Sequence, residues 1–491
     1  MMPARARPSD VLDQLIQSIA HLLPRGVSCH NPSVYEDTIA AIATAPGEAG
    51  IGVVRLSGPL STDIGRRMFR PSSPRRVFRS HHLYHGAVVD GEAVLDEVLF
   101  ACMRAPHSYT AEDVVEFQGH GGTRPLEGIL HLALRHGARL AGPGEFTLRA
   151  FLNGRLDLAQ AEAVADVIKA RSDASLRLAV NQLSGRLSAA VQDARGRVLG
   201  LLAQLQANID FSEDDVPPPA SEPLRQEMCA ARATLTQLLR AADAGILYRQ
   251  GARVAITGRP NAGKSSLLNA LLRTNRAIVT PVAGTTRDTI EESISLDGLP
   301  VVLVDTAGIT NTADVVEAIG VARSREAIGT ADLVLHIFDA ALGWQPEDAA
   351  LWAEVPAATP KLLVANKSDL PPLPAACSAP APSQEPRPVL RTSATTGQGL
   401  GELEAAMRCT LVASAATAVD DILVNNLRHK QLLEDALRHL ADAERALSSS
   451  LPADFICIDL RAALSALGAI TGEDVTEGLL DEIFGRFCIG K

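Results

Sequence analysis

A glycine-rich stretch ending in lysine and serine carries the clearest chemistry of this sequence. The letters GRPNAGKS at 258–265 fit the phosphate-binding spacing G-x-x-x-x-G-K-[ST] and directly follow the apolar run 253–257. Backbone N–H groups of such a loop surround phosphate oxygens, the lysine reaches the β and γ phosphates, and the serine hydroxyl binds Mg²⁺. We therefore expect a strand, a loop and a helix over 265–272, with a nucleotide held by Asn261, Ala262, Gly263, Lys264, Ser265 and Ser266.

Three further motifs favour guanine as the base. DTAG at 305–308 ends a buried-strand run, so its carboxylate can hold Mg²⁺ through water and its glycine leaves an N–H for the γ-phosphate. NKSD at 366–369 places a carboxylate that accepts from N1–H and the N2 amine of guanine, a donor pair that adenine lacks. SAT at 393–395 would bring backbone N–H groups to guanine O6. The predicted GTP contacts from these motifs are Asp305, Thr306, Ala307, Gly308, Asn366, Lys367, Asp369, Ser393, Ala394 and Thr395.

The elements that position these motifs belong to a multidomain chain. Its 491 residues suit about three domains. A net charge of −11 argues against broad, non-specific adhesion to nucleic acid or anionic membranes. The seven cysteines show no C-x-x-C spacing, so neither a disulfide framework nor a zinc site is indicated and a reducing cytoplasm fits. No apolar stretch approaches the roughly 18 residues of a membrane span, and we expect no membrane association.

Composition and periodicity divide the chain into five parts. Residues 1–36 contain no long apolar segment of the secretory type, and we expect a poorly ordered extension or an upstream start codon. Residues 37–153 alternate strand-like runs with turns, as an α+β domain does. Helical spacing fills 154–250 and returns over 414–491, on either side of the nucleotide domain at 251–413. We therefore expect an α/β nucleotide domain inserted into one discontinuous helical domain.

Individual elements are also expected. Alternating apolar residues predict strands over 50–56 and 95–103. Helical spacing predicts helices over 427–448 and 460–467 after the nucleotide domain, and a helix over 318–328 inside it.

Several longer segments resemble the MnmE family, also called TrmE, of tRNA-modification GTPases. They are GVVRLSG at 52–58, EDVVEFQGHGG at 112–122, PGEFT at 143–147, AFLN at 150–153, LDLAQAEA at 156–163 and FCIGK at 487–491. The resemblance extends over 37–491. It implies an N-terminal tetrahydrofolate-binding and dimerisation domain, a discontinuous helical domain and a Ras-like P-loop GTPase domain.

The same resemblance implies an activity and partners. The activity is K⁺-dependent GTP hydrolysis coupled to addition of an aminomethyl or carboxymethylaminomethyl group at C5 of the wobble uridine, position 34, of certain tRNAs. The one-carbon donor is a tetrahydrofolate derivative of the 5,10-methylene or 5-formyl type. The protein acts as a homodimer, in a heterotetramer with the FAD-dependent MnmG.

Carried over by position, the folate contacts are Arg55, Glu116, Arg155 and Lys491. A carboxylate such as Glu116 can accept from pterin N–H groups, and the cations can meet the glutamate tail. Arg155 stands where the family suggests lysine, which keeps the charge but changes its geometry. The resemblance also puts Cys488 near the folate site as a residue required for modification. The alternative is that Cys488 has no role in modification and packs as a small buried hydrophobic residue.

Catalysis of hydrolysis needs a group that orients water, and Ile309 stands where Ras-type enzymes have glutamine. The resemblance points to Glu317 for that role, and the phosphate-binding Lys264 is the other residue of the nucleotide site predicted to be catalytic. The alternative is that Glu317 is an ordinary acidic residue, stabilised by the helix dipole at a helix N-terminus.

A bound K⁺ would supply the charge that an arginine finger supplies elsewhere. The family's K⁺ loop matches Asn261, Thr280, Val282 and Thr285, with Thr286 and Ser265 on Mg²⁺. The nucleotide contacts predicted in this loop are Thr280, Pro281, Val282, Ala283, Gly284, Thr285 and Thr286.

Two other functions are alternatives to tRNA modification. A ribosome-assembly GTPase would carry a basic RNA-binding module or a second tandem GTPase domain, and neither is seen in the sequence. A non-enzymatic scaffold gated by GTP would need neither the folate segment nor Cys488. The nucleoside composition of tRNA from a deletion strain would separate all three.

Overall fold

The computed structural model describes residues 36–74, 77–210, 221–275, 291–305, 327–371, 389–412, 423–449, 451–473 and 475–491. Contacts divide the chain into two compact units. The first takes residues up to Ala165, Gln182–Ala233 and Asp435–Lys491, and the second takes Asp166–Asn181 and Thr234–Glu434. Each unit therefore combines segments that are far apart in the sequence.

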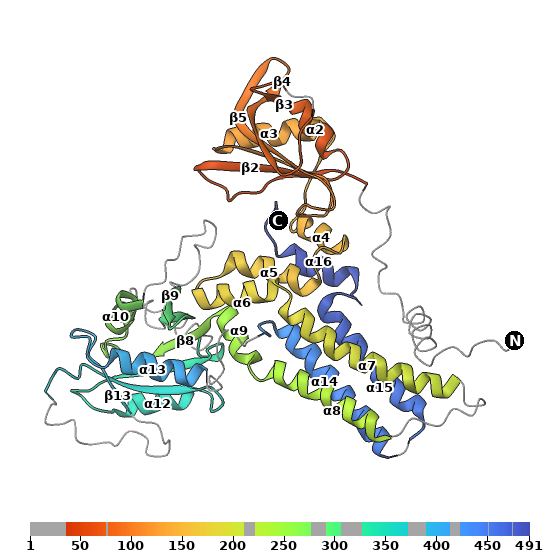
Figure 1. Cartoon of the computed structure of the whole chain (residues 1–491). Coiled ribbons are helices and arrows are strands. Elements are labelled where there is room, and N and C mark those ends of the chain that lie inside the picture. The colour runs from red at the N-terminus through yellow and green to blue at the C-terminus, as the bar shows by residue number, and fades with distance from the viewer. Residues whose placement is uncertain are drawn as a thin grey trace. The chain divides into compact units, whose positions relative to one another are not determined.

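The first unit contains a seven-stranded sheet with two helices on one face (Figure 1). All neighbouring strands are antiparallel except the parallel pair at one end, 39–40 with 139–140. The strands expected over 50–56 and 95–103 are present. In sheet order the strands are β3 (Phe69–Pro71), β4 (His82–Asp90), β5 (Ala93–Met103), β6 (Val114–Gly121), β2 (Ala49–Ser57), β1 (Ile39–Ile42) and β7 (Arg139–Leu140), and the helices are α2 (Ser61–Met68) and α3 (Thr123–Arg135).

The core of this sheet follows from strand alternation. In β5, Val98, Phe100 and Cys102 are buried at every second position. They pack with Phe117 of β6 and with the apolar face of α3, where Ile129 is fully buried. The opposite positions of β2 and β6 carry Arg55, Glu116 and Gln118, so this other face holds the polar residues of interest.

Helices complete the first unit. The long helix α7 (Arg186–Asp210) packs along α15 (Ala453–Thr471). Arg232 of α8 (Ser221–Leu239) forms an ion pair with Glu444 of α14 (Leu427–Ser448). Helices that precede the nucleotide segment in sequence thus pack with helices that follow it. The remaining helices of this unit are α4 (Glu145–Leu152), α5 (Leu158–Lys169) and α16 (Glu477–Gly485), while α6 (Asp173–Leu183) and α9 (Ala242–Gln250) fall largely in the second unit.

A six-stranded sheet forms the core of the second unit, and all of its neighbouring strands are parallel except β9 and β10. Its central strands are apolar over most of their length, as expected of parallel strands covered on both faces. In sheet order the strands are β13 (Leu390–Arg391), β12 (Lys361–Asn366), β11 (Leu333–Asp339), β8 (Ala252–Thr257), β10 (Leu299–Asp305) and β9 (Glu291–Leu296), with helices α10 (Lys264–Asn275), α12 (Pro346–Glu354) and α13 (Leu400–Leu411).

Most expected elements agree with the structure. The glycine-rich loop lies between β8 and α10, and the helix expected over 427–448 is α14. The helix expected over 460–467 is longer, because α15 begins after Pro452 and ends before Gly472, which takes a left-handed conformation at φ 94°. The expected helix at 318–328 lies outside the described residues except for its last two positions. The expected extension at 1–36 lies outside them except for residue 36.

Two smaller observations concern the rest of the chain. In the part that the structure describes, no helix combines the length and apolarity that crossing a bilayer requires. Cys102, Cys229, Cys409, Cys457 and Cys488 are all free thiols.

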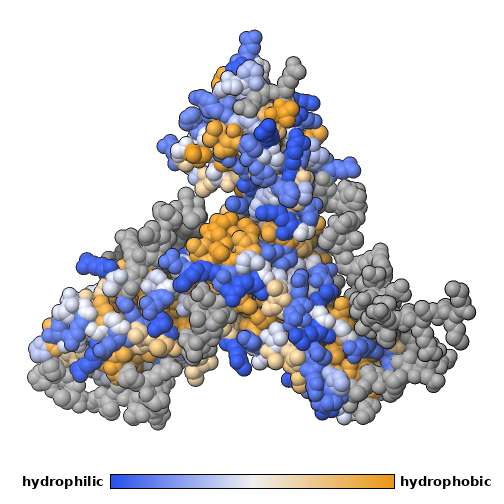
Figure 2. All heavy atoms as spheres, viewed as in Figure 1, coloured by the Kyte–Doolittle hydropathy of each residue, from blue (hydrophilic) through white to orange (hydrophobic). Residues whose placement is uncertain are grey.

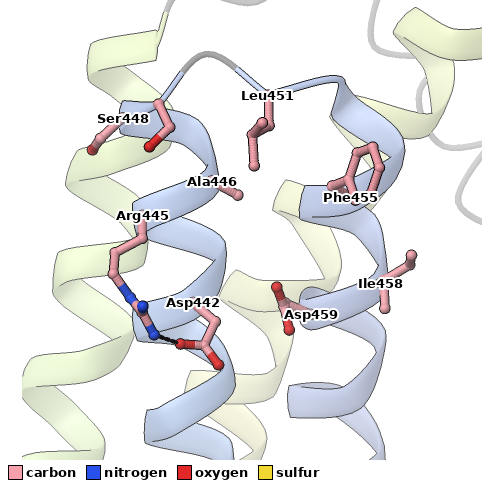
Figure 3. Close-up of a pocket in the computed structure, with 9 residues that line it drawn as sticks. Asp442, Arg445, Ala446, Ser448, Leu451, Phe455, Ile458 and Asp459 are labelled. Atoms are coloured by element: carbon pink, nitrogen blue, oxygen red, sulfur yellow. Dashed lines mark hydrogen bonds and ion pairs between the residues drawn. The ribbon is translucent and has the colours of Figure 1, made fainter.

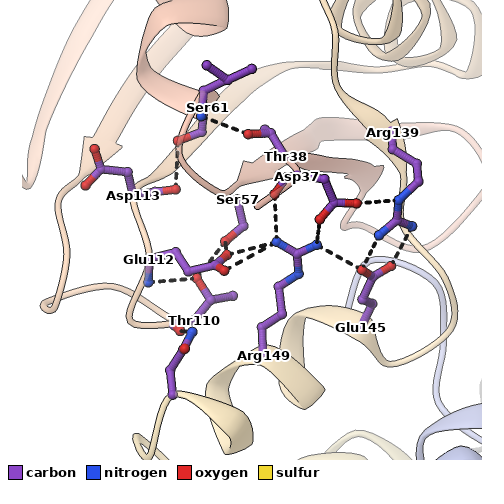
Figure 4. Close-up of polar contacts among 12 residues, drawn as sticks. Asp37, Thr38, Ser57, Ser61, Thr110, Glu112, Asp113, Arg139, Glu145 and Arg149 are labelled. Atoms are coloured by element: carbon purple, nitrogen blue, oxygen red, sulfur yellow. Dashed lines mark hydrogen bonds and ion pairs between the residues drawn. The ribbon is translucent and has the colours of Figure 1, made fainter. Parts of the chain in front are cut away.

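A buried arginine ties three segments of the first unit together (Figure 4). Arg149 of α4 has no exposed surface, and its N–H groups donate to Asp37 Oδ1 at 2.6 Å, Glu145 Oε1 at 3.0 Å and Glu112 at 3.3 Å. Burial raises the pKa of Glu145, but hydrogen bonds from Arg139, the Gly142 N–H and Arg149 outweigh it, so the pKa lies below its ordinary value. These ion pairs fix the start of β1, the start of α4 and the loop before β6 relative to one another.

Candidate functional site

The phosphate-binding loop has the backbone that its glycines allow. Gly258 and Gly263 take φ values of 140° and 93°, and Asn261 takes 65°. A Cβ on Gly258 would lie 2.1 Å from the carbonyl oxygen of Ile337, so a side chain has no space there. Lys264 Nζ donates to the carbonyl oxygens of Gly258 at 2.7 Å and Arg259 at 2.8 Å. The loop thus curls around the lysine ammonium at the start of α10.

Asn366 and Lys367 connect this loop to the rest of the site. Asn366 Nδ2 donates to the carbonyl oxygen of Ala262 at 3.1 Å, and its Oδ1 accepts from the Ala394 N–H at 3.2 Å. Lys367 Nζ donates to the carbonyl oxygen of Asn261 at 2.8 Å and to Asp339 Oδ2 at 2.7 Å. Three motifs that are far apart in the sequence therefore meet at the carboxyl ends of β8, β12 and β13.

Asp369 lies at the exposed side of the same cluster. A hydrogen bond from Ser393 is the main cause of a lowered pKa of its carboxyl, and Thr395 Oγ1 also donates to it, at 3.4 Å. The side chain is therefore ionised at neutral pH, as an acceptor of two base N–H groups must be. The 366–369 and 393–395 motifs form one wall.

The structure describes only some of the other residues predicted to contact the nucleotide. Ser265 and Ser266 lie in the first turn of α10. Asp305 ends β10 opposite Ile256 of β8, which puts its backbone beside the loop, but its side chain is not described. Of the Mg²⁺ and K⁺ ligands, Ser265 and Asn261 are described. The predicted residues outside the described ranges are Thr280, Pro281, Val282, Ala283, Gly284, Thr285, Thr286, Thr306, Ala307, Gly308 and Glu317.

The residues predicted to bind folate come together in the first unit. Arg55 of β2 and Glu116 of β6 are direct cross-strand neighbours, and Arg55 Nε donates to Glu116 Oε1 at 2.8 Å. The guanidinium carbons of Arg55 and Arg155 lie 5.2 and 5.1 Å from the centre of the Tyr109 ring. Both cations therefore contact a single aromatic side chain.

The C-terminal segment adds the fourth predicted residue. Pro143 and Ile489 form an isolated β-bridge, and the Phe146 N–H donates to the main-chain oxygen of Lys491 at 3.2 Å. A Cβ on Gly490, at φ 93°, would lie 2.4 Å from the carbonyl oxygen of Ile42, so the chain passes closely over β1. Burial lowers the pKa of Lys491 and repulsion from Arg55 adds to the shift, whereas Glu116 and Cys488 oppose it. Lys491 is thus close enough to Arg55 and Glu116 to share their electrostatic environment.

The structure changes the interpretation of two residues of this site, Cys488 and Tyr109. Cys488 is exposed, so the alternative of a buried packing residue is wrong. Tyr109 was missed, although it contacts both predicted arginines. A lone tyrosine in the polar stretch HSYTAED at 107–113 has no spacing that marks it as functional. The approach of this loop to β2 and α4 is a tertiary contact that local patterns do not encode.

A separate hollow of about 630 Å³ lies at the end of the α14–α15 hairpin (Figure 3). Its apolar wall includes Phe455 and Ile458, which are 55% and 62% exposed. Asp442 and Asp459 on its polar wall form, with His439, a group of potential metal ligands among the described residues. Arg445 already pairs with Asp442 and neutralises it. None of the predicted site residues lines this hollow.

An apolar surface lies on α6 and the end of α5. Ile168, Leu176 and Val180 are 49%, 41% and 48% exposed. Figure 2 shows apolar side chains gathered over these two helices. Such a surface is typical of interaction sites, but it contains no group that could do chemistry.

Comparisons with known proteins identify the family. The family model described as "GTP-binding protein TrmE N-terminus" matches residues 38–155, and "MnmE helical domain" matches 158–488. A tRNA modification GTPase MnmE of Chloroflexus aurantiacus is 50% identical over 459 residues, covering 93% of this chain and 100% of that protein. The protein of that name from Desulforamulus reducens is 45% identical over 466 residues, covering 93% and 100%.

Solved structures match only part of the chain. Aquifex aeolicus Era bound to GDP and aluminium fluoride is 28% identical, covers 38% of this chain and 66% of that chain, and has a TM-score of 0.26. That score is too low to carry a conclusion.

Proposed function

Since the chain belongs to the MnmE family of tRNA modification GTPases, we propose that its GTP hydrolysis drives a modification at C5 of the wobble uridine of certain tRNAs. The protein is a GTP hydrolase of tRNA modification. The group added is proposed to be aminomethyl or carboxymethylaminomethyl, with its carbon from a tetrahydrofolate derivative. The observation that supports the proposal is one chain with both a guanine-type nucleotide site and a cationic cluster, in which Arg55 pairs with Glu116 and shares the Tyr109 ring with Arg155.

At the nucleotide site, the residues divide the work. Backbone N–H groups of 261–265 and the Lys264 ammonium bind the phosphates and offset their charge. Asn366 keeps the phosphate-binding loop and the base-binding wall in register through its contacts with both. Asp369 selects guanine by accepting two N–H bonds. Glu317 is proposed to orient the attacking water, and it lies outside the described residues.

The metal ions fit the donor types present. Ser265 offers a hydroxyl to Mg²⁺ together with Thr286, and Asn261 offers oxygen to K⁺ together with Thr280, Val282 and Thr285. Hydroxyl, amide and carbonyl oxygens suit both of these hard cations. When bound, such cations stabilise negative charge that develops on the β–γ bridge oxygen.

Replacing K⁺ by Na⁺ should sharply lower GTP turnover, because the Asn261 site needs a cation of suitable size beside the phosphates. The measurement is steady-state phosphate release at constant ionic strength. Asn261→Ala should lose the K⁺ stimulation while nucleotide binding through Lys264 persists. Equal rates of the unmodified protein in the two salts would exclude a role for K⁺.

The second site suits an anionic reduced pterin. Glu116 can accept from pterin N–H groups, while Arg155 and Lys491 can meet the carboxylates of the glutamate tail. Arg155 brings two N–H groups in a fixed plane where the family suggests lysine, so it can bind a carboxylate through two bonds. This donor set therefore supports folate as the ligand.

Cys488→Ser should abolish wobble-uridine modification while GTP turnover stays near normal, because the thiol lies in the first unit and the nucleotide residues lie in the second. Mass spectrometry of tRNA nucleosides from a strain carrying the variant measures the first effect, and phosphate release measures the second. Fully modified tRNA would show that the exposed thiol takes no part. Cys229→Ser, at another exposed cysteine of the same unit, is the matched control.

The organisation of the active assembly is part of the proposal. A homodimer is proposed to form a heterotetramer with FAD-dependent MnmG in the cytoplasm. We also propose the division into a folate-binding domain at 37–153, helical halves at 154–250 and 414–491, and a GTPase domain at 251–413.

Loss of the gene provides the decisive test. A deletion strain should lack the modified wobble nucleosides while its ribosomal subunits assemble normally. Defective subunits with intact nucleosides would support the ribosome-assembly function. Restoration of the nucleosides by a variant that binds but does not hydrolyse GTP would support the scaffold.

A further inference from the structure

Tyr109 occupies the centre of the cationic site, although no sequence pattern marks it. The guanidinium carbons of Arg55 and Arg155 lie 5.2 and 5.1 Å from its ring centre. Its main-chain oxygen accepts from Arg155 Nη1 at 2.7 Å, and its hydroxyl bonds the fully buried Thr147 Oγ1 at 2.9 Å. The ring is thus anchored at its hydroxyl end and contacts both arginines.

The loop that carries Tyr109 is itself held in place. Thr110 is fully buried, its hydroxyl bonds Ser57 Oγ at 2.6 Å, and its carbonyl oxygen accepts from Asn153 Nδ2 at 2.7 Å. Glu112 in the same loop pairs with the buried Arg149. These contacts come from β2 and α4, so the ring position is fixed by the protein alone.

The charges around the Tyr109 ring indicate what a fixed aromatic side chain contributes at this position. Arg55 and Arg155 meet at the Tyr109 ring, Arg55 pairs with Glu116, and Arg55 and Lys491 repel each other. The face of an aromatic ring carries partial negative charge and attracts guanidinium groups. One uncharged ring can therefore hold two arginines near each other, and it adds no negative charge that would repel an anionic ligand.

We infer that Tyr109 is a positioning residue of the proposed folate site, whose ring holds Arg55 beside Glu116 and holds Arg155 ready for the carboxylate-bearing tail of the pteroylglutamate. The inference rests on the proposed function. The tyrosine acts through the two arginines, and it needs its aromatic face more than its hydroxyl.

Binding of 5-formyltetrahydrofolate to the full chain, measured by titration calorimetry, tests this. Tyr109→Leu removes the ring at similar volume and should raise Kd roughly 10-fold or more, the combined effect of two cation–π contacts. Tyr109→Phe keeps the face and should stay within about threefold of the unmodified protein. Phe455→Leu removes an exposed ring elsewhere in the same unit and should bind normally.

The possible results distinguish a failure of the Tyr109 inference from a failure of the proposed folate binding. No binding by the unmodified protein would overturn both. Normal binding by Tyr109→Leu would overturn the inference and leave the folate site standing. Equal losses in the Leu and Phe variants would overturn the role of the ring and assign the effect to the hydroxyl. Melting temperatures of each variant identify a loss caused by unfolding.

A double replacement tests whether the tyrosine acts through Arg155. Arg155→Met should weaken binding strongly in the unmodified protein but much less in the Tyr109→Leu background, because the misplaced arginine already contributes little. Additive losses would overturn the inference, since they would show two independent contributions.

Discussion

Asp369→Asn should transfer the base preference from guanine to xanthine. The amide offers a donor where the carboxylate only accepts, and xanthine carries O2 in place of the N2 amine of guanine. GTP affinity should fall roughly 10²-fold or more, because a site built to hydrogen-bond its substrate rejects an unmatched partner strongly. XTP should bind the variant better than it binds the unmodified protein. Competition binding with the two nucleotides measures both effects.

The structure offers a matched control for this exchange. Asp297 follows β9 in the same unit and its side chain is 79% exposed, so Asp297→Asn makes the same chemical change away from the base-binding wall. It should discriminate GTP from XTP normally. If Asp369→Asn also discriminates normally, then Asp369 does not read the base, despite its place beside Thr395.

Glu317→Ala should slow GTP hydrolysis by roughly 10²-fold or more, the size of effect expected for a positioned water-orienting group. GTP affinity should stay within a few-fold, because the phosphate-binding loop and Asp369 are untouched. The same variant should fail to modify tRNA, since GTP hydrolysis is proposed to drive that modification. Single-turnover hydrolysis and nucleoside analysis measure these effects.

The alternative for Glu317 is an ordinary acidic residue at a helix N-terminus. Glu402 in the first turn of α13 is such a residue, and Glu402→Ala therefore gives the effect expected of that alternative. Similar turnover by the two variants in saturating K⁺ would assign water positioning to another residue. Modification that continues without turnover would show that binding of GTP is sufficient.

The meeting of the motifs at 258–265, 366–369 and 393–395 follows from the sequence because much of it is encoded locally. The apolar strand, the glycines that permit positive φ, and the helix that begins at Lys264 occupy one continuous stretch. The order of β8, β12 and β13 then brings Asn366 and Ser393 to the same edge of the sheet. Parallel topology makes that meeting a consequence of the strand pattern.

The folate-type site is harder to predict from the sequence because its geometry depends on tertiary contacts. Arg55 and Glu116 are opposite each other only through the register of β2 and β6. Tyr109 reaches them through a loop whose position depends on Thr110 and Arg149. Resemblance supplied the four charged residues, but the ring between two of them required the structure. Glu317 and the loop at 280–286 remain predictions.

Arg149 also bears on the order in which the first unit assembles. Its partners Asp37, Glu112 and Glu145 are 112, 37 and 4 residues away in the sequence. Glu145 lies on the same helix and accompanies Arg149, whereas Asp37 and Glu112 come from distant segments. Breaking a buried ion pair costs about 3–5 kcal/mol, so α4 docks most stably once both distant carboxylates are in place. Contacts of such long range form slowly. We expect the segment from Asp37 to α4 to fold in one concerted step, with no stable intermediate that has the helix in place and the first strand absent.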